Sequence, residues 1–81
     1  MQADEIKRLI EDAIPGAEAI VKGEGDHFEA IVISEAFAGL NMVKQHQMVY
    51  AALGDAFQGQ LHALSLHTYS PEEWAEHPRL Q

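Results

Sequence analysis

Five histidines and no cysteine define the metal chemistry open to this 81-residue chain. Imidazole can bind a transition metal or transfer a proton, whereas disulfides, catalytic thiols and thiolate ligands from this chain are excluded. Two of the histidines open predicted strands: His27 begins HFEAIVIS, and His62 begins HALSLHTY. The possible chemistry therefore depends on whether the fold brings these two imidazoles to one place.

The first 34 residues predict a helix followed by a β-hairpin. Apolar residues recur at helical spacing near the N-terminus, and Pro15-Gly16 ends that helix. Strands are predicted over residues 18–22 and 27–34, joined by a turn at Gly23–Asp26. The apolar positions of the helix are Ile6, Leu9, Ile10, Ala13 and Ile14.

A second helix is predicted after a helical turn around Phe37. Asn41 is its expected cap, and Gly59 is expected to close it. An apolar stripe at helical spacing predicts the face that packs on the core. This stripe consists of Val43, His46, Tyr50, Leu53 and Phe57, widened by Met42, Val49, Ala52 and Ala56; Lys44, Gln45, Gln47, Met48 and Asp55 point elsewhere.

The last part of the chain predicts a third strand over residues 61–69 and a short helix. Ser70-Pro71-Glu72-Glu73 is a capping box with proline at the first helical position. We expect Trp74 to pack back on the domain.

This order of elements predicts a single α+β domain over residues 1–81, arranged α-β-β-α-β-α, with helices on one face of a small three-stranded mixed sheet. The long crossover over residues 35–60 favours parallel pairing of the second and third strands. Parallel neighbours begin at the same edge of a sheet, about 4.8 Å apart. His27 and His62 would then stand side by side at one rim.

The charge of the chain restricts its partners. The net charge is −8, and the five cationic residues are scattered along the sequence. Nucleic acid and anionic membrane surfaces are therefore disfavoured, whereas a basic protein surface is compatible. The charged, amphipathic N-terminus does not read as a signal peptide, and no apolar run approaches a membrane span. We expect a soluble cytoplasmic protein.

Four segments together resemble the BolA-like family: HFEAIVIS, Phe37-Ala38-Gly39, VKQHQMVYAAL and LHALSLHTYSPEEW. The resemblance covers nearly the whole chain and implies a class II KH-like fold. It also implies a non-enzymatic protein of iron–sulfur trafficking and iron-dependent stress regulation. Members of this family pair with monothiol glutaredoxins and share a [2Fe–2S] cluster.

The resemblance implies a ligand set as well. The histidine that opens the third strand is a cluster ligand in the family, and His62 stands at that position. The second ligand comes from the loop before the second strand, and the matching residue is His27. Two histidines can replace two cysteines on one iron. The glutaredoxin cysteine and glutathione would supply the thiolates that this chain lacks.

Two departures concern a nucleic-acid function, which is the alternative hypothesis. The family often has Arg-His-Arg in the long helix, where this chain has Gln45-His46-Gln47. A KH domain needs Gly-x-x-Gly, whereas this junction reads Gly39-Leu40-Asn41-Met42. A KH-like transcription regulator is therefore less well supported. A third hypothesis is an interaction module that binds its partner without metal.

The remaining histidines are explained without metal. We expect His46 to be partly buried with one satisfied nitrogen, and His67 and His77 to lie at the surface. A zinc site formed by the rim histidines with Glu24 or Asp26 has a weak spacing signal, since structural zinc needs about four ligands. Whether the isolated chain is a monomer or a homodimer is left open.

Overall fold

The computed structural model describes residues 2–25, 27–54 and 63–76. Its elements follow the predicted order, and the helical turn predicted around Phe37 is present as a short 3₁₀ helix. None of the described helices is long and apolar enough to cross a lipid bilayer. The elements are α1 (Ala3–Ala13), β1 (Glu18–Glu24), β2 (His27–Ile33), η1 (Glu35–Phe37), α2 (Met42–Leu53), β3 (Ala63–Tyr69) and α4 (Pro71–Glu76).

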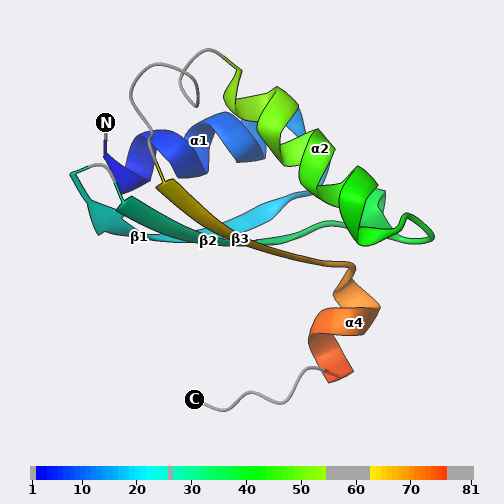
Figure 1. The fold of residues 1–81 in the computed structure, drawn as a ribbon. Helices are drawn as coiled ribbons and strands as arrows, with labels where there is room; N and C mark the ends of the chain where they lie inside the picture. The colour runs from blue at the N-terminus through cyan, green and yellow to red at the C-terminus, as the bar shows by residue number, and fades with distance from the viewer. Residues whose placement is uncertain (1, 26, 55–62, 77–81) are drawn as a thin grey trace.

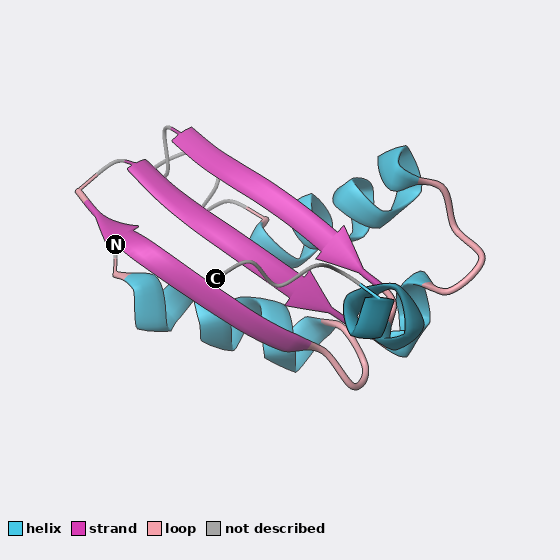
Figure 2. Ribbon diagram, turned by 90° about the horizontal axis from the view of Figure 1, so that it is seen from below, coloured by secondary structure: helices cyan, strands magenta, loops and turns pink. Residues whose placement is uncertain are grey.

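The three strands form one mixed sheet in the order β1-β2-β3. β1 and β2 are antiparallel, and β2 and β3 are parallel, as the crossover length predicts. α1 and α2 cover one face of this sheet, while the short α4 lies beyond the end of β3 on the opposite side (Figure 1). Seen from below, the three strands present a face that neither α1 nor α2 covers (Figure 2).

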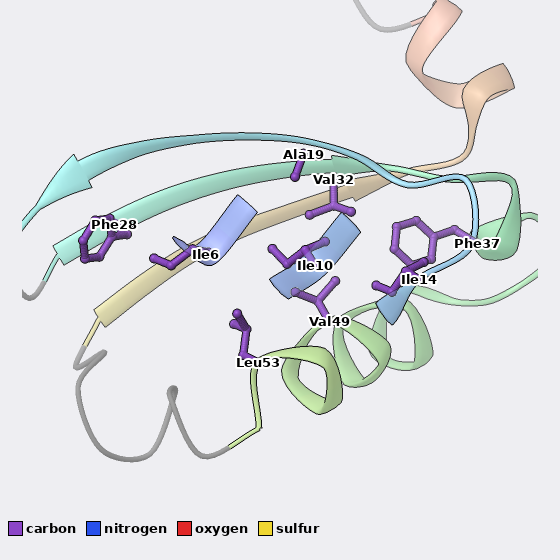
Figure 3. Packing of buried hydrophobic residues seen from close by; sticks show 9 residues of the cluster. All are labelled: Ile6, Ile10, Ile14, Ala19, Phe28, Val32, Phe37, Val49 and Leu53. Atoms are coloured by element: carbon purple, nitrogen blue, oxygen red, sulfur yellow. The ribbon is translucent and has the colours of Figure 1, made fainter. Parts of the chain in front are cut away.

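The core lies between this sheet and the two long helices. β2 alternates, so that Phe28 and Val32 are fully buried and face Ile6 and Ile10 of α1 (Figure 3). Each large side chain buried in this way stabilises the fold by about 1.5–3 kcal/mol. Ile14 is buried as well, so three of the predicted apolar positions of the first helix are confirmed as core.

Side chains of α1 cover the outer edge of β1. Lys7 and Glu11 form an ion pair, with Nζ 2.8 Å from Oε2. Lys7 Nζ also donates to the carbonyl of Ala19 at 2.8 Å, and the Ala19 N–H donates to the Glu11 carboxylate at 3.0 Å. Since β1 is an edge strand, these two bonds occupy backbone groups that would otherwise be open to another strand.

The predicted inward face of α2 is confirmed at Val49 and Leu53 but wrong in the first turns of the helix. Val43 and Met42 are 65% and 64% exposed, whereas Gln45, which was expected to point away from the core, is only 4% exposed. The buried face runs along Gln45, Val49 and Leu53, spaced by four residues. Gln45 is tolerated there because all its polar groups find partners: Nε2 donates to the Phe37 and Leu40 carbonyls, and Oε1 accepts from Thr68 Oγ1.

α2 also ends earlier than predicted. Its last residue is Leu53, and Gly54 follows with φ +54°, a left-handed conformation that glycine adopts without steric cost. The expected stop at Gly59, the stripe residues Ala56 and Phe57, and Asp55 lie outside the described residues.

The junction of β3 and α4 confirms the predicted capping box. The Ser70 hydroxyl accepts from the Glu73 N–H at 3.1 Å, and the Glu73 carboxylate accepts from the Ser70 N–H at 2.8 Å. Trp74 packs back as expected, with its ring centroid 5.3 Å from that of Tyr69. The reciprocal bonds hold the first turn of α4 against the end of the sheet.

Candidate functional site

The candidate site is the edge of the sheet where β2 and β3 begin. His27 is the first residue of β2 and is paired with Ala63, the first residue of β3. The predicted adjacency and parallel direction of these strands are therefore confirmed. His62 immediately precedes Ala63 in the chain and lies outside the described residues, as does Leu61, where the strand was expected to begin.

His27 has an exposed side chain, and its backbone is paired with a strand on each side. The next residue, Phe28, is fully buried in the core, and strand pairing fixes both residues between β1 and β3. Among the described residues the His27 ring makes no hydrogen bond. An exposed imidazole on a fixed backbone suits a ligand that must reach a second molecule.

Gly23 lies against the backbone of His27, a contact that was not predicted from the sequence. The turn was predicted over Gly23–Asp26, but β1 continues to Glu24, which pairs with His27. Gly23 has φ +128°, and a Cβ added there would lie 2.4 Å from the His27 carbonyl oxygen and 2.8 Å from the Phe28 Cα. The available signal was an isolated glycine in a strand pattern, which often marks a close approach of two backbones.

A hollow of about 430 Å³ opens at the same end of the molecule. The start of α1 lines one side, with Asp4, and the β1–β2 turn lines the other, with Glu24. Both carboxylates belong to a chain of net charge −8, so this end is a poor surface for phosphate. Glu24 is near His27 through strand pairing, while Asp26 lies outside the described residues.

The other described histidines lie away from this edge. His67 is exposed on β3 and is paired with Ile31, four positions along the strand from the His27–Ala63 pair, as predicted. His46 is half-buried on α2, with its ring 6.4 Å from that of Tyr50. Its Nε2 is buried and has no hydrogen-bond partner in the described part of the chain, where one satisfied nitrogen was expected.

No complete metal site is formed within the described ranges. Residues 2–25, 27–54 and 63–76 contain no group of three His, Asp or Glu side chains arranged to hold a metal ion. With no cysteine anywhere in the chain, the histidines of this edge by themselves are too few for the four ligands of a structural zinc site. Any thiolate ligand at this edge would come from another molecule, because the chain has no cysteine.

Comparison with known proteins matches one family over most of the chain. The sequence model of the family described as BolA-like protein matches residues 7–73. The acid stress protein IbaG of Escherichia coli is 36% identical over 81 residues, covering 99% of this chain and 96% of that protein. The DNA-binding transcriptional regulator BolA of Vibrio cholerae is 40% identical over 57 residues, 70% of this chain and 54% of that protein.

Solved structures share the fold. The structure of a BolA protein homologue from Coxiella burnetii has a TM-score of 0.84 and 39% identity, with 93% of this chain and 97% of that chain covered. The class II KH-like prediction is therefore confirmed at the level of a BolA fold.

Proposed function

Because the chain belongs to the BolA-like family, we propose that it is a non-enzymatic adaptor that pairs with a monothiol glutaredoxin. In this proposal the two proteins share a [2Fe–2S] cluster, with His62 and His27 as the ligands from this chain. The relatives named above are called a stress protein and a regulator, and neither name describes an enzyme. The observation that carries the proposal is the pairing of His27 with Ala63.

The strand register supports a joint site for two histidines. Paired strands lie about 4.8 Å apart, and consecutive Cα atoms are about 3.8 Å apart along the chain. His62 is one residue from Ala63, which is itself the partner of His27. Side chains on two residues this close along the sheet edge would have the reach to bind a single iron.

The donor set also supports a cluster that is shared. Two histidines can occupy one iron of a two-iron cluster while two thiolates hold the other. This chain has the imidazoles and lacks the thiols, which a glutaredoxin cysteine and glutathione would provide. Held in this way, the cluster would supply an iron centre that can change its charge by one electron or pass to a recipient protein.

Reconstitution with a monothiol glutaredoxin, iron, sulfide and glutathione tests the proposal by visible circular dichroism. We expect His62→Ala to abolish the spectrum of the mixed cluster, and His27→Ala to lower cluster retention roughly tenfold, because each removes a ligand. His67→Ala is the matched control, since it removes an exposed histidine from β3 away from the rim. If His62→Ala has the spectrum and stability of the parent, the ligand assignment is wrong.

Chelation separates this proposal from a metal-free interaction module. We expect partner affinity to fall when iron is removed from the mixture, because the cluster bridges the two proteins. A metal-free module would bind with the same affinity after chelation and after loss of both histidines. Equal affinities in all these conditions would replace the adaptor proposal with the interaction module.

DNA binding is not adopted from the Vibrio cholerae relative, because no described feature favours it. Phosphate contacts need clustered cations, and the chain has 13 acidic and 5 basic residues. Of the cations, Lys7 is engaged with Glu11 and the Ala19 carbonyl. Retention on duplex DNA that falls steeply with salt would return this function to consideration.

A further inference from the structure

We propose that Gly23 is a positioning residue for the ligand His27: it leaves the space in which the His27 carbonyl must lie for the imidazole to reach the shared cluster. This inference rests on the adaptor function proposed above. It assigns a role in the site to a residue that has no side chain and no metal-binding atom. Its basis is the close approach of the His27 and Phe28 backbones to Gly23 and the burial of the residues around it.

The contact leaves no room for a side chain. Gly23 has φ +128°, a conformation that L-residues rarely adopt, and it is paired with Phe28 across the hairpin. An added Cβ would meet the His27 carbonyl oxygen at 2.4 Å, where ordinary contacts are 3.4–4 Å. To relieve this overlap, the two strands must move apart by about 1 Å at this point.

The burial of Phe28 and the exposure of His27 determine which of these two residues is displaced by a side chain at position 23. The same Cβ would lie 2.8 Å from the Phe28 Cα and 3.1 Å from its Cδ1, but Phe28 is fully buried and packs in the cluster with Ile6. Displacing that ring would open the core, which is costly. His27 and Glu24 are exposed, so the displacement is absorbed by the first peptide of β2 and the turn before it.

Such a displacement exceeds what a metal ligand tolerates. Metal–ligand distances are reproducible within about 0.2 Å, and working sites hold their side chains within about 0.5 Å. A shift of about 1 Å at the His27 backbone is therefore enough to weaken its bond to iron. Gly23 thus acts through His27 and touches no reacting atom.

The chain offers two matched control glycines. Gly25 lies in the same turn and Gly16 follows α1, and both have φ +69°. A Cβ added at either position meets nothing within 4 Å. Gly25→Ala and Gly16→Ala therefore introduce left-handed backbone strain without displacing His27, whereas Gly23→Ala introduces strain and displacement together.

The test compares these three variants in reconstitution with glutaredoxin, after circular dichroism has confirmed that each chain is folded. Trimethylamine N-oxide, which favours compact states, corrects any folding deficit. We expect Gly23→Ala to lower cluster retention roughly tenfold and to weaken the nitrogen hyperfine coupling of the reduced cluster. We expect Gly25→Ala and Gly16→Ala to stay within about twofold of the parent.

A double variant identifies the route of the effect. If Gly23 acts through His27, Gly23→Ala should have no further effect in a His27→Ala background, so the two losses will not add. Additive losses would overturn the positioning role, as would equal cluster retention in Gly23→Ala and Gly16→Ala. A Gly23→Ala chain that stays unfolded in the osmolyte would assign Gly23 to folding and also overturn the role.

The failure of this inference differs from failure of the adaptor function. If the parent assembles no mixed cluster, or if His27→Ala behaves as the parent, the proposed function or its His27 ligand fails, and the positioning role falls with it. If His27→Ala weakens the cluster and Gly23→Ala does not, the adaptor function stands and only the positioning role is wrong.

Discussion

Replacement of Gln45 by leucine tests how the polar contact between α2 and β3 stabilises the fold. Gln45 is 4% exposed and bonds to three groups. Its Nε2 donates to the Phe37 carbonyl at 3.2 Å and to the Leu40 carbonyl at 2.9 Å. Its Oε1 accepts from Thr68 Oγ1 at 2.7 Å. Gln45→Leu keeps a similar volume and removes all three bonds.

The magnitude depends on which groups lose their last partner. The Phe37 carbonyl keeps the Leu40 N–H, 3.1 Å away. Loss of the hydrogen bond to the Leu40 carbonyl, which is partly accessible to water, lowers stability by about 1 kcal/mol. Loss of the bond from the buried Thr68 hydroxyl lowers it by about 2 kcal/mol. The leucine side chain offsets about 1 kcal/mol through apolar burial. The free energy of unfolding should therefore fall by about 2 kcal/mol, which corresponds to about 10 °C in Tm.

Urea unfolding followed by circular dichroism measures this loss. Gln47→Leu is the control, because Gln47 is exposed on the same helix and its replacement should change stability by less than about 0.5 kcal/mol. Thr68→Val should cost about 1–2 kcal/mol, since it leaves the Gln45 Oε1 unpaired. In the double variant neither the unpaired Thr68 hydroxyl nor the unpaired Gln45 Oε1 is present, so the combined loss should be about 3 kcal/mol smaller than the sum of the two single losses.

Two results would refute this reasoning. If Gln45→Leu is as stable as the parent, the buried hydrogen bonds contribute nothing beyond what an apolar side chain provides. If the losses in Gln45→Leu and Thr68→Val add fully, the two side chains are not coupled and the contact between them is energetically irrelevant.

Two further predictions concern the ends of the sheet. The hydrogen bond from the Lys7 ammonium, and to a smaller extent the bond from the Ala19 N–H, lowers the pKa of Glu11 below its usual value of about 4.3. The stability that the ionised Glu11 contributes is therefore complete above about pH 4.3 and is lost as the pH falls through the lowered pKa. Glu11→Gln should lower the free energy of unfolding from urea titration by up to about 1 kcal/mol at pH 7, and this loss should shrink as the pH is lowered below about 4.3. A loss that does not change with pH would contradict the linkage. Ser70→Ala removes the bond to the Glu73 N–H and should destabilise α4 by about 1 kcal/mol, seen as faster hydrogen exchange over residues 71–76 and altered Trp74 fluorescence. Unchanged exchange would show that the cap is not needed.

Periodicity and local turn chemistry were sufficient to predict the layers of this fold. HFEAIVIS alternates, and the structure buries Phe28 and Val32 from it as a strand pattern requires. The capping box at Ser70 formed because its bonds join residues three apart. The long crossover implied parallel pairing, which is found, and it brings His27 opposite Ala63.

The sequence by itself thus determined the order of elements, the strand directions and the donor types: imidazole is present and thiol is absent. Only the tertiary structure decided which face of α2 is inward and how close β1 comes to His27. Gln45 is buried because Thr68 and two carbonyls, distant along the chain, satisfy its amide. Gly23 is required because two backbones nearly touch. Local patterns cannot encode either fact, since both arise from groups that meet only after the chain has folded.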